Sequence, residues 1–167
     1  LLYGRFSKPK PKLMFSKSAL LSPYKDITGL MARVANPKDS QLINVEAEVM
    51  YSQIETVDGK KSRRFYTLNL EMNKISLFVT SWTIVHPINE ESPLFNLDYN
   101  DLIERNAEMI LLISAYDESY NQSIHARTSY KYQEIIPNAK FNSILGQNAN
   151  QQSVIHLDKL NEYETTV

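Results

Sequence analysis

Alternation of apolar and polar residues with a period of two constrains this chain more than any other feature. Between residues 41 and 55, the apolar Val45, Ala47, Val49 and Tyr51 are interspersed with asparagine, glutamate and serine. Successive side chains of a strand point to opposite faces, so this spacing predicts a long strand with one buried face. Such a strand needs partner strands on both sides.

The rest of the sequence supplies those partners. Asp58 and Gly59 are a strong signal for a two-residue hairpin turn, and residues 64–70 form the expected returning strand. Further short runs with strand character are residues 12–16, 19–24, 28–35, 77–85, 107–116, 123–132, 140–145 and 154–157. One short helix is expected after Asp98, with Asp101 at its third position, and residues 146–152 read as a polar loop. The pattern predicts an all-β fold, an antiparallel sandwich with one short helix.

Charge is distributed unevenly along the chain. The first 25 residues hold six of the 18 basic residues and none of the 19 acidic ones. A basic leader before an acidic body indicates an anionic partner near the N-terminal end. A membrane surface suits this short run better than nucleic acid does, because each Lys or Arg near anionic lipid contributes about 1 kcal/mol. A solvated tail is the alternative.

The sequence offers little for catalysis. There is no cysteine, no HExxH motif and no phosphate-binding glycine loop, and the three histidines lie on separate elements. We therefore expect no catalytic residues, no metal and no cofactor. Two alternatives stay open at this point: a stand-alone sandwich that binds peptide or carbohydrate, and a hydrolase that uses Glu90 or Glu118. Adjacent residues of a strand point apart, which argues against Asp117 and Glu118 acting as a pair.

Several segments resemble inward-rectifier potassium channels. Residues 82–95, WTIVHPINEESPLF, closely resemble a motif of that family, with Asn89 in place of the usual aspartate. Other matching segments, in the same order and near-correct spacing, are residues 8–16, 30–36, 45–47 and 126–130. The short lysine-bearing linker is more similar to the prokaryotic, KirBac-type branch than to the animal one.

This resemblance implies an immunoglobulin-like sandwich that assembles as a homotetramer around a central passage. Residues 1–12 would be the end of the inner pore helix and a basic linker, and residues 13–167 the cytoplasmic domain. The location implied is the cytoplasmic side of the cell inner membrane. The protein implied is a voltage-gated potassium channel that is also an inward rectifier, and nucleic acid is not among its partners.

Particular residues carry the functions that the resemblance implies. Arg5, Lys8, Lys10 and Lys38 fall on positions that contact anionic phospholipid headgroups, notably phosphoinositides.

A second set falls on positions along the ion pathway, where potassium ions and polyamine blockers pass. These are Glu46, Ser114, Glu118 and Asn121, the last two within a pore-narrowing loop expected at residues 115–121. Because Ser114 replaces an acid and Lys74 stands near other acidic positions, we expect weak polyamine block.

Overall fold

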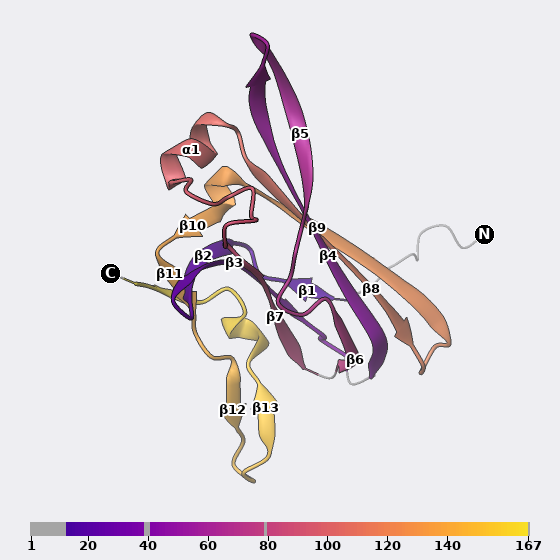
Figure 1. The fold of residues 1–167 in the computed structure, drawn as a ribbon. Helices are drawn as coiled ribbons and strands as arrows, with labels where there is room; N and C mark the ends of the chain where they lie inside the picture. Colours follow the sequence, from indigo (N-terminus) through magenta and orange to yellow (C-terminus); the bar gives the residue numbers. More distant parts are fainter. Residues whose placement is uncertain (1–12, 39–40, 79, 167) are drawn as a thin grey trace, which may run out of the picture.

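The computed structural model describes residues 13–38, 41–78 and 80–166 and folds most of them into two packed β-sheets (Figure 1). One sheet consists of β1 (Met14–Phe15), β2 (Ala19–Tyr24), β3 (Ile27–Ala35), β7 (Ser81–Pro87) and β10 (Ile135–Pro137). The other consists of β4 (Leu42–Val57), β5 (Lys60–Leu68), β6 (Lys74–Phe78), β8 (Glu108–Asp117) and β9 (Gln122–Lys131). The all-β sandwich expected from the sequence is confirmed.

Smaller elements lie outside the two sheets. Strands β11 (Ala139–Phe141) and β14 (Tyr163–Thr165) form one antiparallel pair, and β12 (Leu145–Gln147) and β13 (Ser153–Ile155) form another. The helical elements are α1 (Tyr99–Glu104) and two single 3₁₀ turns, η2 (Tyr132–Glu134) and η3 (Leu157–Lys159).

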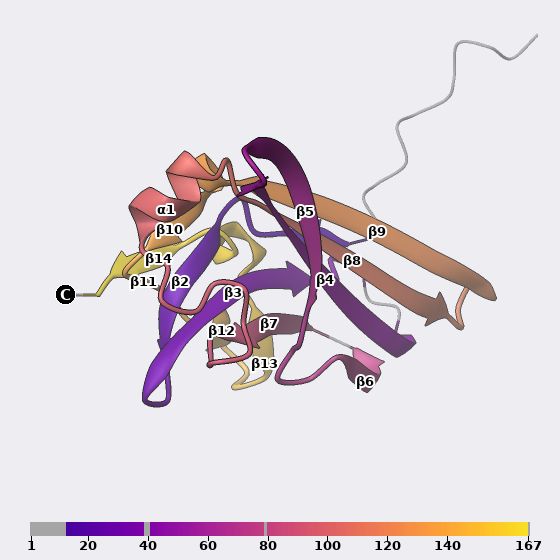
Figure 2. The same cartoon turned by 45° about the horizontal axis from the view of Figure 1, so that its top comes forward.

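Strand β4 organises the second sheet. Its first half pairs with β6 and its second half with β5 along one edge, while β8 pairs along the other edge. Figure 2 shows β4, β8 and β9 running side by side. Inward-facing residues of these strands, such as Val49, Leu111 and Ile113, pack against Leu30 and Ile84 of the first sheet. This continuous core fixes which face of the second sheet points outward.

A β-bulge at Asn44 sets the phase of β4. The pairing with β8 shifts between Ile43 and Glu46, and Asn44 adopts a left-handed backbone with φ 50°. One extra residue reverses the side to which the following residues point. Leu42 and Val45 therefore both point into the core although three residues separate them, and Glu46 points outward.

The Asp58-Gly59 hairpin is confirmed. Both residues have positive φ, 52° and 73°, as a type I′ turn requires, and Val57 pairs with Lys60. The predicted helix is confirmed too. Asp98 caps α1 by accepting a hydrogen bond from the Asp101 amide at 2.9 Å, and Asp101 accepts from the Asp98 amide at 2.8 Å.

Two predicted strands are wrong in their bounds. The run 77–85 is not one strand, because β6 pairs with β4 in one sheet and β7 pairs with β3 in the other. The run 140–145 divides between β11 and β12, because Ile144 turns into a small core with Ala35 and Leu160. Strand β10 was not predicted, and it pairs with β2 in parallel.

Arg33 joins the C-terminal segment to the sandwich. Its side chain is 4% exposed in the middle of β3. The guanidinium donates to the carbonyl oxygens of Leu160 (2.6 Å), Lys159 (2.9 Å) and Asn142, and it lies 4.5 Å from the centre of the Phe141 ring. Burial lowers the pKa of Arg33, and the nearby Glu162 carboxylate opposes that shift. One side chain thus satisfies several carbonyls of a segment with little regular structure.

Candidate functional site

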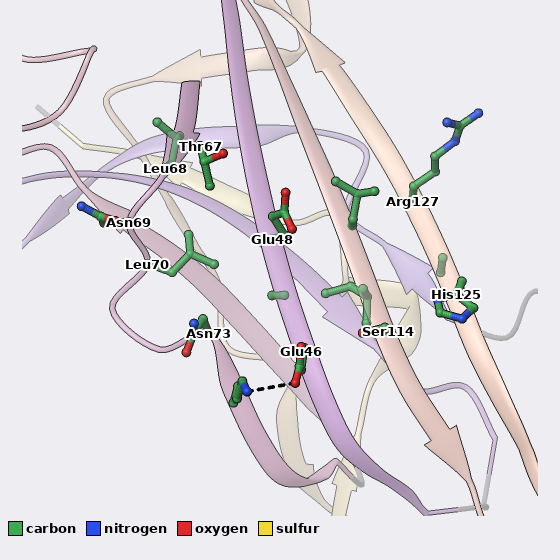
Figure 3. A pocket seen from close by; sticks show the side chains of 15 residues that line it. Glu46, Glu48, Thr67, Leu68, Asn69, Leu70, Asn73, Ser114, His125 and Arg127 are labelled. Atoms are coloured by element: carbon green, nitrogen blue, oxygen red, sulfur yellow. Dashed lines mark ion pairs between the residues drawn. The ribbon is translucent and has the colours of Figure 1, made fainter. Parts of the chain in front are cut away.

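The outward face of the second sheet is hollowed into an open groove of about 1220 Å³. Its walls come from β4, β6, β8, β9 and the segment that follows β5 (Figure 3). Glu46 and Glu48 project from β4 into this groove, two residues apart and both exposed. The sequence prediction that these two acids share a face is therefore confirmed.

Side chains on neighbouring strands extend the two acids into rows. Glu46 lies opposite Ser114 of β8, which in turn lies opposite His125 of β9. The next row along the sheet places Glu48 opposite Leu112, which lies opposite Arg127. Figure 3 shows these labelled side chains around the groove. The groove thus carries both signs of charge and one exposed apolar residue.

Lys74 partly neutralises the acidic wall. Its Nζ atom lies 3.1 Å from Oε1 of Glu46 (dashed in Figure 3), with side-chain exposures of 68% for Lys74 and 53% for Glu46. Such an exposed pair contributes little to stability, at most about 1 kcal/mol. Its effect on the groove is electrostatic, because an ammonium group sits beside the carboxylate that would attract cations.

The other predicted pathway residues lie at the turn between β8 and β9. The loop expected at residues 115–121 is shorter than predicted, because Ala115 and Asp117 belong to β8 and only residues 118–121 form the turn. Glu118 is exposed there. Asn121 closes the turn with a left-handed backbone, φ 49°, and its Oδ1 accepts a hydrogen bond from the Tyr116 hydroxyl.

Asp117 is buried where its neighbour Glu118 is exposed. Its side chain is 1% exposed, and Oδ1 accepts a hydrogen bond from the Ser119 amide at 2.9 Å. Oδ2 is the one buried side-chain polar atom in the described part of the chain without a hydrogen-bond partner. The two carboxylates point to different environments, so they do not form an acid–base pair.

The predicted lipid residues fall into two groups. Arg5, Lys8 and Lys10 lie outside the described residues. Lys38 follows β3, where its backbone amide donates to Asn36 Oδ1 at 3.1 Å. Its Nζ atom lies 5.6 Å from the centre of the Tyr120 ring, in the turn between β8 and β9. Sequence reasoning missed this contact, because no local pattern relates two residues on separate loops.

The segment 86–95 is an ordered turn. Buried His86 contacts the Asn69 carbonyl oxygen through Nδ1 at 2.5 Å and Ser92 Oγ through Nε2 at 2.7 Å. Burial lowers the pKa of His86. Ser92 Oγ also accepts from the Leu94 amide at 3.1 Å, as expected for a turn-forming serine. This arrangement is architectural, since both ring nitrogens serve to hold the turn against the strand.

A polar pocket of about 590 Å³ lies at the base of the β4–β5 hairpin. Gln53 Nε2 donates to Glu55 at 3.0 Å, and the Tyr66 hydroxyl donates to the same carboxylate. These bonds, the one from Tyr66 first, lower the pKa of Glu55. Within the described ranges, no three His, Asp or Glu side chains are grouped to hold a metal ion, and no helix is long and apolar enough to cross a membrane.

Comparison with known proteins places this geometry in a family context. Residues 13–167 match the family model described as the inward rectifier potassium channel C-terminal domain. The inward rectifier potassium channel Kirbac3.1 of Paramagnetospirillum magnetotacticum is 29% identical over 97% of this chain and 55% of its own length. The ATP-sensitive inward rectifier potassium channel 12 of Gallus gallus is 27% identical over 99% of this chain and 41% of its own length.

These matches correct one expectation and limit another. The expectation of a voltage-gated channel is wrong, because the matching family and relatives are inward rectifiers, a different class of potassium channel. The chain spans only about half of the length of the relatives it matches, or less.

Proposed function

Because the chain belongs to the family of inward rectifier potassium channel C-terminal domains, we propose that it forms the cytoplasmic regulatory part of such a channel. In this role it lines the cytoplasmic ion pathway and couples anionic lipid binding to gating. Residues 13–167 are the cytoplasmic domain, and residues 1–12 are the end of the inner helix and a basic linker. The channel is a homotetramer in the cell inner membrane, with this domain on the cytoplasmic side.

The observation that carries this proposal is the outward groove of the second sheet. Glu46 is exposed on it, with Ser114 in register beside it. Around a fourfold axis, one such acid per subunit becomes a ring of four that attracts potassium ions and polyamines. Glu118 and Asn121 supply a second level of the pathway at the turn between β8 and β9.

The charge of this groove supports weak polyamine block. Lys74 stands 3.1 Å from the acid of the first ring, and Ser114 brings no charge of its own. Lys74→Ala should therefore strengthen spermine block of the full-length channel, because it uncovers four carboxylates per tetramer. Spermine titrations of macroscopic current measure the effect, and Lys140→Ala, an exposed lysine on β11, serves as the matched control. Equal block in both variants contradicts the placement of Glu46 on the ion pathway.

The lipid part of the proposal rests on the end of the molecule that Lys38 occupies. Strand β1 pairs with the end of β3, Met14 opposite Ala35, so the first described residues and Lys38 lie at the same end. Basic residues on the adjoining linker, Arg5, Lys8 and Lys10, would then reach the same membrane surface. Each contributes about 1 kcal/mol to binding an anionic leaflet.

Neutralising the three linker residues tests this part. Arg5→Gln, Lys8→Gln and Lys10→Gln together should abolish the response of the reconstituted full-length channel to phosphoinositide in the vesicle membrane. A matched control changes three exposed basic residues of the β4–β5 hairpin, Lys60, Lys61 and Arg64, at the opposite end of β4. An unchanged lipid response in the linker variant, or an equal loss in the hairpin variant, refutes the assignment.

The two alternatives from the sequence are not retained. The matching family consists of ion channels, which are not enzymes, so a hydrolase using Glu90 or Glu118 has no support. A stand-alone peptide- or carbohydrate-binding sandwich leaves the family match unexplained. Light scattering on the full-length protein separates the readings, because a tetramer is expected for the channel and a strict monomer contradicts it.

A further inference from the structure

Two loops for which the sequence predicts different tasks meet in the fold. Lys38 follows β3 and is a proposed lipid contact, whereas Tyr120 sits at the tip of the turn between β8 and β9, on the proposed ion pathway. The Lys38 Nζ atom lies 5.6 Å from the centre of the Tyr120 ring. This distance is within the range of a cation–π interaction.

The backbones on both sides of this contact are anchored. The Lys38 amide donates to Asn36 Oδ1 at 3.1 Å, and the amide of Asn36, which is 3% exposed, donates to the Thr80 carbonyl oxygen at 2.9 Å. The turn that carries Tyr120 is closed by the bond from the Ser119 amide to Asp117 Oδ1. Rotation of the flexible lysine side chain is therefore the simplest way to make or break the contact.

The contact is placed where an anionic headgroup would compete for it. The Tyr120 side chain is 66% exposed, and Lys38 is partly exposed. An exposed cation–π contact corresponds to only about a two- to fivefold equilibrium factor. A charge-assisted hydrogen bond from an ammonium group to a phosphate oxygen is stronger. A phosphate that reaches Lys38 would therefore draw its side chain away from the ring.

We propose that Tyr120 is the residue through which a lipid headgroup at Lys38 acts on the turn at residues 118–121. Without lipid, the ammonium group of Lys38 rests on the Tyr120 ring and links the two loops. With lipid, the phosphate takes the ammonium group and the turn that carries Glu118 is released from the loop after β3. This inference rests on the proposed function, since it names the link between the lipid contact and the ion pathway.

Thermodynamic reciprocity gives the sign of the expected effect. If lipid binding breaks the contact, then the contact must oppose lipid binding by the same factor. Removing the ring should therefore increase the apparent lipid affinity by about two- to fivefold, the factor of the lost cation–π contact. This sign holds whether the lipid opens or closes the channel.

The experiment uses the full-length channel in phosphatidylcholine vesicles with a graded mole fraction of phosphatidylinositol bisphosphate, and rubidium flux as the readout. Tyr120→Leu removes the aromatic ring and should lower the half-effective lipid fraction about two- to fivefold. Tyr120→Phe keeps the ring and should leave the half-effective fraction unchanged. In a Lys38→Met background, Tyr120→Leu should have no further effect.

The outcomes separate this inference from the proposed function. If the parent channel does not respond to the lipid, the proposed function fails at its lipid part. If it responds but Tyr120→Leu leaves the half-effective fraction unchanged, or Tyr120→Phe shifts it as much, the inference alone is overturned. A parallel series with soluble inositol trisphosphate distinguishes a membrane headgroup from a free phosphate, and a flux response there overturns the lipid as the source.

Discussion

Replacing Arg33 by methionine tests how the C-terminal segment is held to the sandwich. The methionine side chain fills a similar apolar volume within β3 but donates no hydrogen bond. It leaves the carbonyl oxygens of Leu160, Lys159 and Asn142 without the guanidinium, and it removes the contact with the Phe141 ring. The structural change is confined to one side chain, so the effect on stability reports the value of this network.

The magnitude follows from the groups left unsatisfied. A buried polar group that loses its partner costs about 1–3 kcal/mol, and Leu160 is only 1% exposed. The Lys159 and Asn142 carbonyls are less deeply placed and cost less each. We expect the free energy of unfolding to fall by about 3–5 kcal/mol, in the range for breaking a buried charged network. For a chain of this size this corresponds to a lower Tm by roughly 6–20 °C.

Urea denaturation followed by fluorescence of Trp82 gives the global change in stability. Hydrogen exchange of the η3 amides, among them Leu160 bonded to the Leu157 carbonyl, shows whether the segment opens separately. Arg33→Lys is the matched control, because it keeps the charge but cannot reach three carbonyls, and it should lose less stability. A methionine variant within 1 kcal/mol of the parent, with unchanged exchange at η3, refutes the reasoning.

Three further predictions concern stability. Gly146→Ala would place a methyl group 2.4 Å from His156 Nε2, so it should speed hydrogen exchange in the β12–β13 hairpin, and His156→Ala in the same chain should restore protection. Asn44→Val forces a β-branched residue into φ 50° and should cost about 1–2 kcal/mol in urea denaturation, whereas Asn44→Gly should be nearly neutral. Burial lowers the pKa of His86, so the unfolded chain binds the proton more readily, and stability should be lost as pH falls below about 6.5. The urea midpoint between pH 7 and 5 should depend less on pH in His86→Gln than in the parent, while His125→Gln at an exposed position keeps the parent slope.

Periodicity predicted the strands well where one face of a strand is buried throughout. The alternation along β4 is of this kind, and its hairpin with β5 follows from the Asp58-Gly59 turn. The run 77–85 defeated the same reasoning because it is apolar on both sides of a change of sheet. Nothing local distinguishes a strand that continues from one that crosses to another sheet, since only tertiary pairing decides it.

The candidate site was predictable in its residues but not in its contacts. The spacing of Glu46 and Glu48 sufficed to place both acids on one face, because period-two geometry is local. The bulge at Asn44, which turns that face outward, has only a weak signal in the sequence, the odd spacing between Leu42 and Val45. The ion pair with Lys74 and the contact of Lys38 with Tyr120 depend on strand pairing and loop approach, which single-sequence patterns do not encode.

The geometry of β4 explains why coupling between the two proposed sites should run through side chains. Lys38 lies a few residues before this strand and Glu46 lies within it, and at ~3.3 Å per residue Glu46 is roughly 13 Å from the start at Leu42. The strand is paired on both edges over this stretch, with β6 on one side and β8 on the other. A sheet held in this way resists bending, so a headgroup at Lys38 would move the loops at its end before it moved the groove. The turn that carries Tyr120 and Glu118 is the adjacent element with freedom to respond.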